Sequence, residues 1–244
     1  MGQAGRILAA LFREIEPRVA PGVSTLELDA FAEEFIRSHD GATPAFKGLY
    51  GFPASLCTSL NDEVVHGIPS ARRRLRSGDI ISVDAGVKLD GWFADSARTF
   101  PVGEIPPKTQ VLIAATQQAL HAGIAQTRAG NRLGDVGHAI QTVARAAGLG
   151  IVRDLVGHGI GREPHEEPQV PNYGERGRGL PLQPGLVLAL EPMLNEGGPG
   201  VRTLPDRWTV VTADRSRSAH FEHTVAVTAD GPRILTAEAT HRTE

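Results

Sequence analysis

The sequence predicts an α+β protein, a single domain over residues 1–244 that is built from two similar halves. Two observations lead to this prediction: helix-like and strand-like segments recur in the same order along the chain, and a strong hairpin signal lies in the first half. Each half alone is too short to bury much core, so one duplicated domain fits better than two unrelated ones. We place the duplicated parts at roughly residues 5–105 and 108–237.

An amphipathic helix is predicted early in each half. In PGVSTLELDAFAEEFI (21–36) and AGNRLGDVGHAIQTVA (129–144), a glycine turn leads through Ser24 or Asn131 into apolar residues spaced three and four apart. The apolar positions agree at a constant separation of 108 residues, with Leu28, Phe31, Ala32 and Phe35 matching Val136, Ala139, Ile140 and Val143. Another helix, near 108–127, joins the halves.

The similarity continues into the strands. VHGIP (65–69) has a counterpart in GHGIG (157–161), and the apolar strand DIISVDAGV (79–87) has one in GLVLALEPML (185–194). Each half is therefore predicted as a helix, an HGI segment, a strand, a turn and a strand. The alternative is that such short patterns recur by chance.

The segment DIISVDAGVKLDGWFADSARTF (79–100) is predicted to form a β-hairpin around an Asp-Gly turn. If the register is centred between Leu89 and Asp90, cross-strand partners have numbers that sum to 179, and Asp84 faces Asp95 directly. Like charges opposite each other destabilise a sheet. Two partly buried carboxylates in contact must share a proton or hold a cation.

The second half carries the same anomaly. Glu191 interrupts the apolar run LVLALEPML, and Glu222 lies in AHFEHTVAVT on the strand face of Thr224 and Ala226. For one acid in one strand, a salt bridge or a solvated face is the simpler explanation. Four acids at corresponding places in a duplicated chain favour a shared site instead.

With His158, the set consists of four carboxylates and one imidazole. Such an oxygen-rich set suits Mn, Fe, Co or Zn, and it does not resemble a structural zinc site. Two divalent ions, about 3.5–4 Å apart and bridged by carboxylates, can neutralise the four negative charges. A water held between the ions loses a proton near neutral pH and becomes a nucleophile.

Composition excludes several classes of protein. The formal charge of −3 gives no basic face for specific DNA binding, and the single cysteine, Cys57, excludes an internal disulfide. The start of the chain lacks the apolar core of a signal peptide, and no apolar run approaches about 18 residues. We expect a cytoplasmic protein without a membrane segment. The basic run ARRRLRSGD (71–79) is interpreted as a solvated turn, with docking to an anionic surface such as RNA as the alternative.

Five motifs resemble those of type I methionine aminopeptidases: NDEVVHGIP (61–69), VDAGVKLDGWFADSART (83–99), GHGIGREPHEEP (157–168), ALEPM (189–193) and FEHTVAVT (221–228). The resemblance runs in order from about residue 5 to residue 237. It implies the pita-bread fold, in which two pseudosymmetric halves surround a curved antiparallel sheet covered by helices. It also implies removal of the N-terminal methionine from newly made proteins and peptides, preferably when the second residue is small.

The resemblance implies a role for each matching residue. The five metal ligands fall on Asp84, Asp95, His158, Glu191 and Glu222, with Asp95 and Glu222 bridging two divalent ions, whether Co, Mn, Fe or Zn. Glu191 is also implied as the general base, and hydrolysis is implied to use a hydroxide that bridges the metals. His66 and His165 are implied to contact the scissile amide and its carbonyl.

The implied methionine pocket includes Phe52, Cys57 and Trp208, whose apolar and polarisable side chains suit methionine. Two positions depart from the family pattern: Leu49 stands where many relatives have tyrosine, and Pro164 replaces a usual phenylalanine or methionine. Phe52 and Trp208 can equally be read as plain core residues.

Two other functions stay open at this point. One is a proline-directed aminopeptidase or dipeptidase of the same fold, which usually carries a large extra N-terminal domain. The other is a metal-free binding protein, which would have lost ligands that this chain keeps. We expect methionine-bearing peptides and nascent chains as partners, a transient ribosome contact and a monomer.

Overall fold

The structure, a computed structural model, describes residues 1–237. Its α-helices are α1 (Gly2–Ile15), α2 (Thr25–Arg37), α3 (Pro107–Gln126) and α4 (Leu133–Ala146). The helices predicted near 21–36, 108–127 and 129–144 are all present, because their apolar residues face the protein interior at helical spacing.

The two helices that follow the glycine turns are capped differently. Ser24 is the N-cap of α2, where its hydroxyl accepts the Glu27 N–H and the Glu27 carboxylate accepts the Ser24 N–H. The turn through Asn131 leads into α4 as predicted, and the N-cap is Arg132. Its backbone N–H donates to the Asp135 carboxylate at 2.8 Å. The guanidinium has no acceptor atom, so only this half of a capping box is formed.

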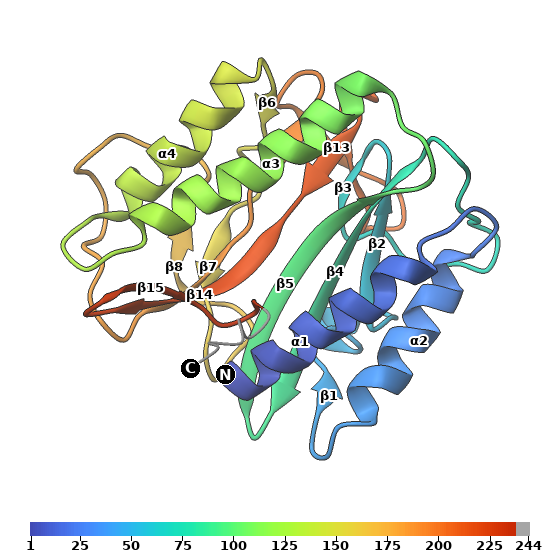
Figure 1. The fold of residues 1–244 in the computed structure, drawn as a ribbon, viewed down its shortest axis with the longest axis horizontal. Helices are drawn as coiled ribbons and strands as arrows, with labels where there is room; N and C mark the ends of the chain where they lie inside the picture. The colour runs from blue at the N-terminus through green and yellow to red at the C-terminus, as the bar shows by residue number, and fades with distance from the viewer. Residues whose placement is uncertain (238–244) are drawn as a thin grey trace, which may run out of the picture.

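Nine strands form one antiparallel sheet, which curves across the molecule (Figure 1). Seven of them follow in the order β1-β4-β5-β14-β9-β7-β8, while β2 pairs with β4 and β15 pairs with β14. Their bounds are β1 (Thr43–Pro44), β2 (Leu56–Leu60), β4 (Ile80–Leu89), β5 (Trp92–Pro101), β7 (Gly157–Gly159), β8 (Glu166–Val170), β9 (Val187–Leu190), β14 (Glu222–Thr228) and β15 (Gly231–Ile234).

Two small antiparallel sheets complete the strands of the described chain. One has the order β13-β10-β6 and the other the order β11-β12-β3. Their bounds are β3 (Glu63–Val65), β6 (Gly150–Ile151), β10 (Met193–Asn195), β11 (Val201–Thr203), β12 (Val210–Thr212) and β13 (Ser218–His220).

The predicted hairpin is present as β4 and β5, but the predicted register was wrong. Both turn residues have left-handed backbones, with φ 53 at Asp90 and φ 74 at Gly91, as a two-residue type I′ loop requires. The hairpin is therefore centred one residue later, and Asp95 lies opposite Gly86 rather than opposite Asp84. Because side chains alternate along a strand, Asp84 and Asp95 are diagonal neighbours on one face.

The strand predicted over 185–194 is divided in two. Pro192 lacks the N–H that a continuous ladder needs, so β9 ends at Leu190 and β10 begins at Met193 in another sheet. The two HGI segments also differ in place. His158 lies within β7 of the large sheet, whereas His66 follows β3 of a small sheet.

The helices cover one face of the large sheet (Figure 1). Helix α1 packs on β4 and β5, and α3 packs on strands of the second half, including β14. Helices α2 and α4 pack against α1 and α3, respectively. Two large apolar clusters result. One draws on residues 4 to 102, and the other on Ile80 and residues 112 to 227. The strands β5 and β14, which belong to different halves, meet at the centre of the sheet.

Candidate metal centre

The five predicted ligands come from neighbouring strands of the large sheet. Asp84 lies on β4, Asp95 on β5, Glu222 at the start of β14 and His158 on β7, while Glu191 directly follows β9. The structure brings all five side chains to the wall of one cavity of about 280 Å³. Residues separated by more than a hundred positions in the sequence thus meet because the sheet pairs strands from both halves.

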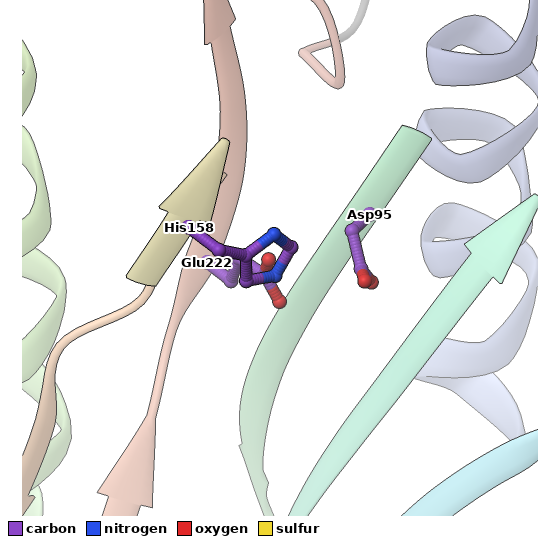
Figure 2. A group of neighbouring side chains, drawn as sticks. All are labelled: Asp95, His158 and Glu222. Atoms are coloured by element: carbon purple, nitrogen blue, oxygen red, sulfur yellow. The ribbon is translucent and has the colours of Figure 1, made fainter. Parts of the chain in front are cut away.

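Asp95, His158 and Glu222 form the tightest group, and each offers an atom within 4.8 Å of the others. Figure 2 shows these three side chains gathered from three strands, with the imidazole directed between the two carboxylates. Nδ1 of His158 lies 2.8 Å from the carbonyl of Gly159. When Nδ1–H donates to this carbonyl, the lone pair of Nε2 faces the group, the orientation that a metal ligand needs.

The remaining two predicted ligands lie beside this group. Oε1 of Glu191 is 3.6 Å from Nε2 of His158. Burial raises the pKa of Asp84 well above its ordinary range, and the charge of the neighbouring Asp95 raises it further. The two acids are therefore diagonal neighbours on one face of the hairpin, and both line the cavity, although the direct opposition that the sequence predicted does not occur.

Burial perturbs every titratable group of the cluster. It raises the pKa of Asp95 to about 7, and it raises the pKa of Glu222 well above its ordinary range, with the nearby charge of Asp95 as the next cause. The pKa values of Asp84 and Glu191 are raised for the same two reasons. Burial lowers the pKa of His158 to about 4, so the imidazole is neutral at pH 7 and free to bind a metal.

The donor set fits divalent cations. Oδ1 of Asp84 and Oε1 of Glu222 are buried without a hydrogen-bond partner among residues 1–237. Within the same part of the chain, no lysine or arginine forms an ion pair with any of the four carboxylates. Buried carboxylates need a proton or a cation, and four of them around one neutral imidazole form an oxygen-rich site for a divalent metal.

His66 and His165 line the same cavity. The rings of His165 and His158 meet edge to face, with centroids 4.5 Å apart. His66 has a left-handed backbone with φ 59, and its ring lies edge-on to Trp208. Burial lowers the pKa of both histidines, so each is neutral at pH 7 and carries one N–H donor. A left-handed backbone at a non-glycine residue is the kind of strain found at functional sites.

Part of the cavity lining is apolar. Phe52 and Cys57 are buried in a cluster against which Trp208 and Leu49 pack, and all four line the cavity. The ring of Phe52 lies edge-on to that of Trp208, with centroids 5.1 Å apart. Pro164 is buried next to His165 but is not among the lining residues.

Sequence reasoning missed two aromatic residues of this cavity. Phe46 belongs to the apolar wall, and Tyr50 lies at the rim, 75% exposed and stacked on the ring of His165 at 6.0 Å. Gly48 and Gly51 both have positive φ, and the Gly48 N–H donates to the carbonyl of Phe52. This pair of glycines was the available signal, because it marks a tight turn just before Cys57.

Residues 1–229 match the model of metallopeptidase family M24. The chain belongs to this family. The matched residues include all five predicted ligands, so the metal dependence that the family name describes agrees with the donor set.

The relatives match this chain along most of their length. The methionine aminopeptidase of Clostridium perfringens is 52% identical over 236 residues, which cover 97% of this chain and 94% of the relative. Methionine aminopeptidase 1 of Mycobacterium tuberculosis is 54% identical over 242 residues, covering 97% and 91%. The solved structure of methionine aminopeptidase from Thermotoga maritima matches with a TM-score of 0.96 and 42% identity, covering 98% of this chain and 95% of that one. The pita-bread fold predicted from the sequence is thereby confirmed.

Proposed function

We propose that the protein is a metal-dependent methionine aminopeptidase that removes the N-terminal methionine of newly made proteins and peptides, preferably when the second residue is small. The observation that carries this function is one cavity with two unlike walls. One wall holds four buried carboxylates and an imidazole, and the other holds Phe52, Cys57 and Trp208. The first suits metal-dependent hydrolysis, and the second suits an unbranched apolar side chain. Relatives about half identical to this chain bear the same activity in their names.

Two divalent ions per chain are the proposed cofactors, with Asp84, Asp95, His158, Glu191 and Glu222 as ligands. The two orphaned carboxylate oxygens and the lack of a basic partner in residues 1–237 support this assignment. Two ions also balance four carboxylate charges. When bound, such ions lower the pKa of a water molecule and polarise the scissile carbonyl. Cobalt, manganese, iron and zinc all accept this donor set.

The other roles belong to protein groups around the scissile bond. His165, beside His158 at the mouth of the cavity, donates a hydrogen bond to the substrate carbonyl oxygen as negative charge develops there. His66 hydrogen-bonds the scissile amide from the other side. Glu191 accepts a proton from the attacking water and passes it to the leaving amine. Burial and the nearby charge of Asp95 raise the pKa of Glu191, so this carboxyl group holds a proton more tightly than an ordinary glutamate does.

The methionine side chain is proposed to lie against Phe52, Cys57 and Trp208. A cavity of about 280 Å³ suits one such side chain and the peptide bond that follows it. Leu49 lines the same wall, so the hydroxyl that a tyrosine at this position would supply is absent from it. Pro164 acts only through the position of His165.

We further propose a cytoplasmic monomer whose partners are nascent chains, with no specific DNA and no membrane partner. Among residues 1–237, no helix is long and apolar enough to cross a membrane. A transient ribosome contact is proposed through the basic run 71–79. There Arg73 and Arg74 pair with Glu63 and Glu27, while Arg72 and Arg76 are exposed. We also propose that the chain is one domain made of two similar parts, residues 5–105 and 108–237.

The test is peptide trimming after chelator treatment, with Mn, Fe, Co, Zn or no metal added back. Met-Ala-Ser, Leu-Ala-Ser and Ala-Pro-Ser peptides are followed by mass spectrometry. We expect metal-dependent release of methionine alone. Cleavage of Leu-Ala-Ser or Ala-Pro-Ser instead would keep the metal site and overturn the methionine specificity. No cleavage with any metal would favour a binding protein of this fold.

A further inference from the structure

His220 is a buried histidine that the proposed chemistry does not use. It ends β13, is only 2% exposed, and lies opposite Met193 in the pair of β13 with β10. It does not line the cavity. Its Nε2 atom is buried and has no hydrogen-bond partner among residues 1–237. A purely space-filling role does not explain this, because burying a polar atom without a partner is unfavourable.

An acceptor that lies close to this atom belongs to a predicted metal ligand. Nε2 of His220 lies 3.8 Å from Oε2 of Glu191, whereas Oε1 of the same carboxylate lies 3.6 Å from Nε2 of His158. The two oxygens of Glu191 therefore face different imidazoles. The distance to His220 exceeds a typical N–H···O bond by about 0.8 Å. A shift of the carboxylate toward the ring by about 0.8 Å brings the pair to hydrogen-bond distance.

The backbone of His220 is fixed independently of Glu191. Its N–H donates to Oγ1 of Thr99, and the Thr99 hydroxyl donates to the His220 carbonyl, both at 2.9 Å. Oγ1 of Thr99 is also 2.8 Å from Oγ of Ser82. The hairpin of the first half thus fixes the backbone from which the His220 ring extends, and Nε2 of this ring lies 3.8 Å from Oε2 of Glu191.

We propose that His220 is a positioning residue for the reaction. Its Nε2–H donates a hydrogen bond to Oε2 of Glu191 and holds the carboxylate so that Oε1 faces His158 and the metal centre. This inference rests on the proposed function of that centre. Groups that hydrogen-bond a metal ligand from behind determine its orientation, and their loss lowers metal affinity or activity by about 10- to 100-fold.

The experiment compares His220→Leu with His220→Gln. The side-chain amide of glutamine keeps an N–H donor at a similar reach, and leucine removes it. Mn²⁺ affinity is measured by calorimetric titration, kcat and KM with Met-Ala-Ser, and Tm by scanning calorimetry. We expect His220→Leu to lose about 10- to 100-fold in Mn²⁺ affinity and kcat. KM should change little because His220 does not line the cavity, and His220→Gln should recover most of the loss.

Two results overturn the inference. One is wild-type Mn²⁺ affinity and kcat in His220→Leu. The other is a glutamine variant as impaired as the leucine variant at an unchanged Tm, because a donor would then be irrelevant. The control is His39→Leu, which removes a half-buried imidazole just beyond α2. This variant should keep the Mn²⁺ affinity and the kcat of the wild type.

A measurement on the unmodified protein covers the case in which His220→Leu does not fold. Nitrogen-15 NMR of the Zn²⁺-loaded protein reports which ring nitrogen of His220 carries the proton. A proton on Nε2 supports the inference, and a proton on Nδ1 alone overturns it. If the wild-type protein releases no methionine, the proposed function fails, while Mn²⁺ affinity and the tautomer still decide the role of His220.

Discussion

Removing the metal should make the stability of the protein depend on pH through Asp95, and Asp95→Asn isolates this effect. Burial raises the pKa of Asp95 from 3.8 to about 7. The folded state therefore binds this proton more tightly than the unfolded chain does. The free energy of unfolding contains an Asp95 contribution that falls as pH rises from about 4 to about 7 and stays level above it.

The magnitude follows from the shift. About three pKa units at about 1.4 kcal/mol each give a loss of about 4 kcal/mol over this interval. For a chain of this length, that corresponds to a Tm change of about 8–16 °C. Asparagine keeps the oxygen that accepts the Ser96 N–H but has no proton to lose. Relief of the repulsion on Asp84 acts in the same direction.

Several histidines oppose this trend, which is why a matched variant is needed. Burial lowers the pKa of His158 to about 4 and those of His220 and His223 to about 3. These groups make the folded state more stable as pH rises toward about 6.5, the pKa of the unfolded chain. Their contribution is common to wild type and Asp95→Asn, so it cancels in the difference between the two proteins.

The assay is scanning calorimetry of both chelator-treated proteins between about pH 4 and pH 7.5. We expect similar Tm values at the acidic end and a more stable Asp95→Asn protein at pH 7. Saturating Mn²⁺ should reverse the order, since binding at about 1,000 times Kd stabilises by about 4 kcal/mol and the variant lacks a ligand. A Tm difference that does not change with pH in the absence of metal would refute the reasoning.

Three further changes have separate expected outcomes. His165→Ala should lower kcat by about 100-fold or more, because His165 lines the cavity mouth. Its Tm should stay near that of wild type, because the side chain carries little core packing. Near-normal turnover in this variant would contradict the role assigned to His165. Asp29→Ala should lower the free energy of unfolding, measured in urea, because the buried N–H groups of Ser55 and Leu56 both donate to this carboxylate. The expected loss is about 1–3 kcal/mol for each N–H group. Asp29→Asn keeps an acceptor and should lose far less stability, so equal losses in the two variants would contradict this account. Gly157→Ala should lower both Tm and metal affinity, because the new Cβ would stand 2.3 Å from the carbonyl oxygen of Ala189 and force β7 away from β9. The control is Gly2→Ala, where no atom lies closer than 3.9 Å to the new Cβ. A Gly157→Ala protein with the Tm and metal affinity of this control would count against the tight pairing of β7 with β9.

Local signals in the sequence predicted the parts of the fold that depend on local chemistry. Ser24 and Glu27 carry a complete capping box, so the start of α2 could be predicted, whereas Arg132 is an atypical cap and was missed. The Asp-Gly turn identified the hairpin, but its one-residue register depends on backbone dihedral angles that composition does not reveal. Pro192 was visible in the sequence, yet the separation of β9 from β10 depends on which strands lie beside them.

The sequence also allowed only part of the candidate site to be predicted, namely the residues that stand out from their immediate neighbours in the chain. Acids inside apolar runs are conspicuous, so the four carboxylates could be singled out from the sequence alone. His220 and Tyr50 gave no comparable signal. His220 matters only through the 3.8 Å separation from Glu191, and Tyr50 through its stacking on His165. Each of these two contacts joins residues that are distant in sequence, so neither contact can be predicted from the local sequence around either residue.

The pairing of β5 with β14 also has a consequence for how the protein is made. Glu222, the last of the five ligands, lies more than a hundred residues after Asp84 and Asp95, and the pairing of β14 with β5 brings these acids together. During synthesis from the N-terminus, the ligand set stays incomplete until residue 222 has left the ribosome. Closing so long a loop also makes the sheet a slow, non-local event in folding. Metal capture should therefore report completion of the fold, and an unfinished chain should hold neither the metal nor the activity.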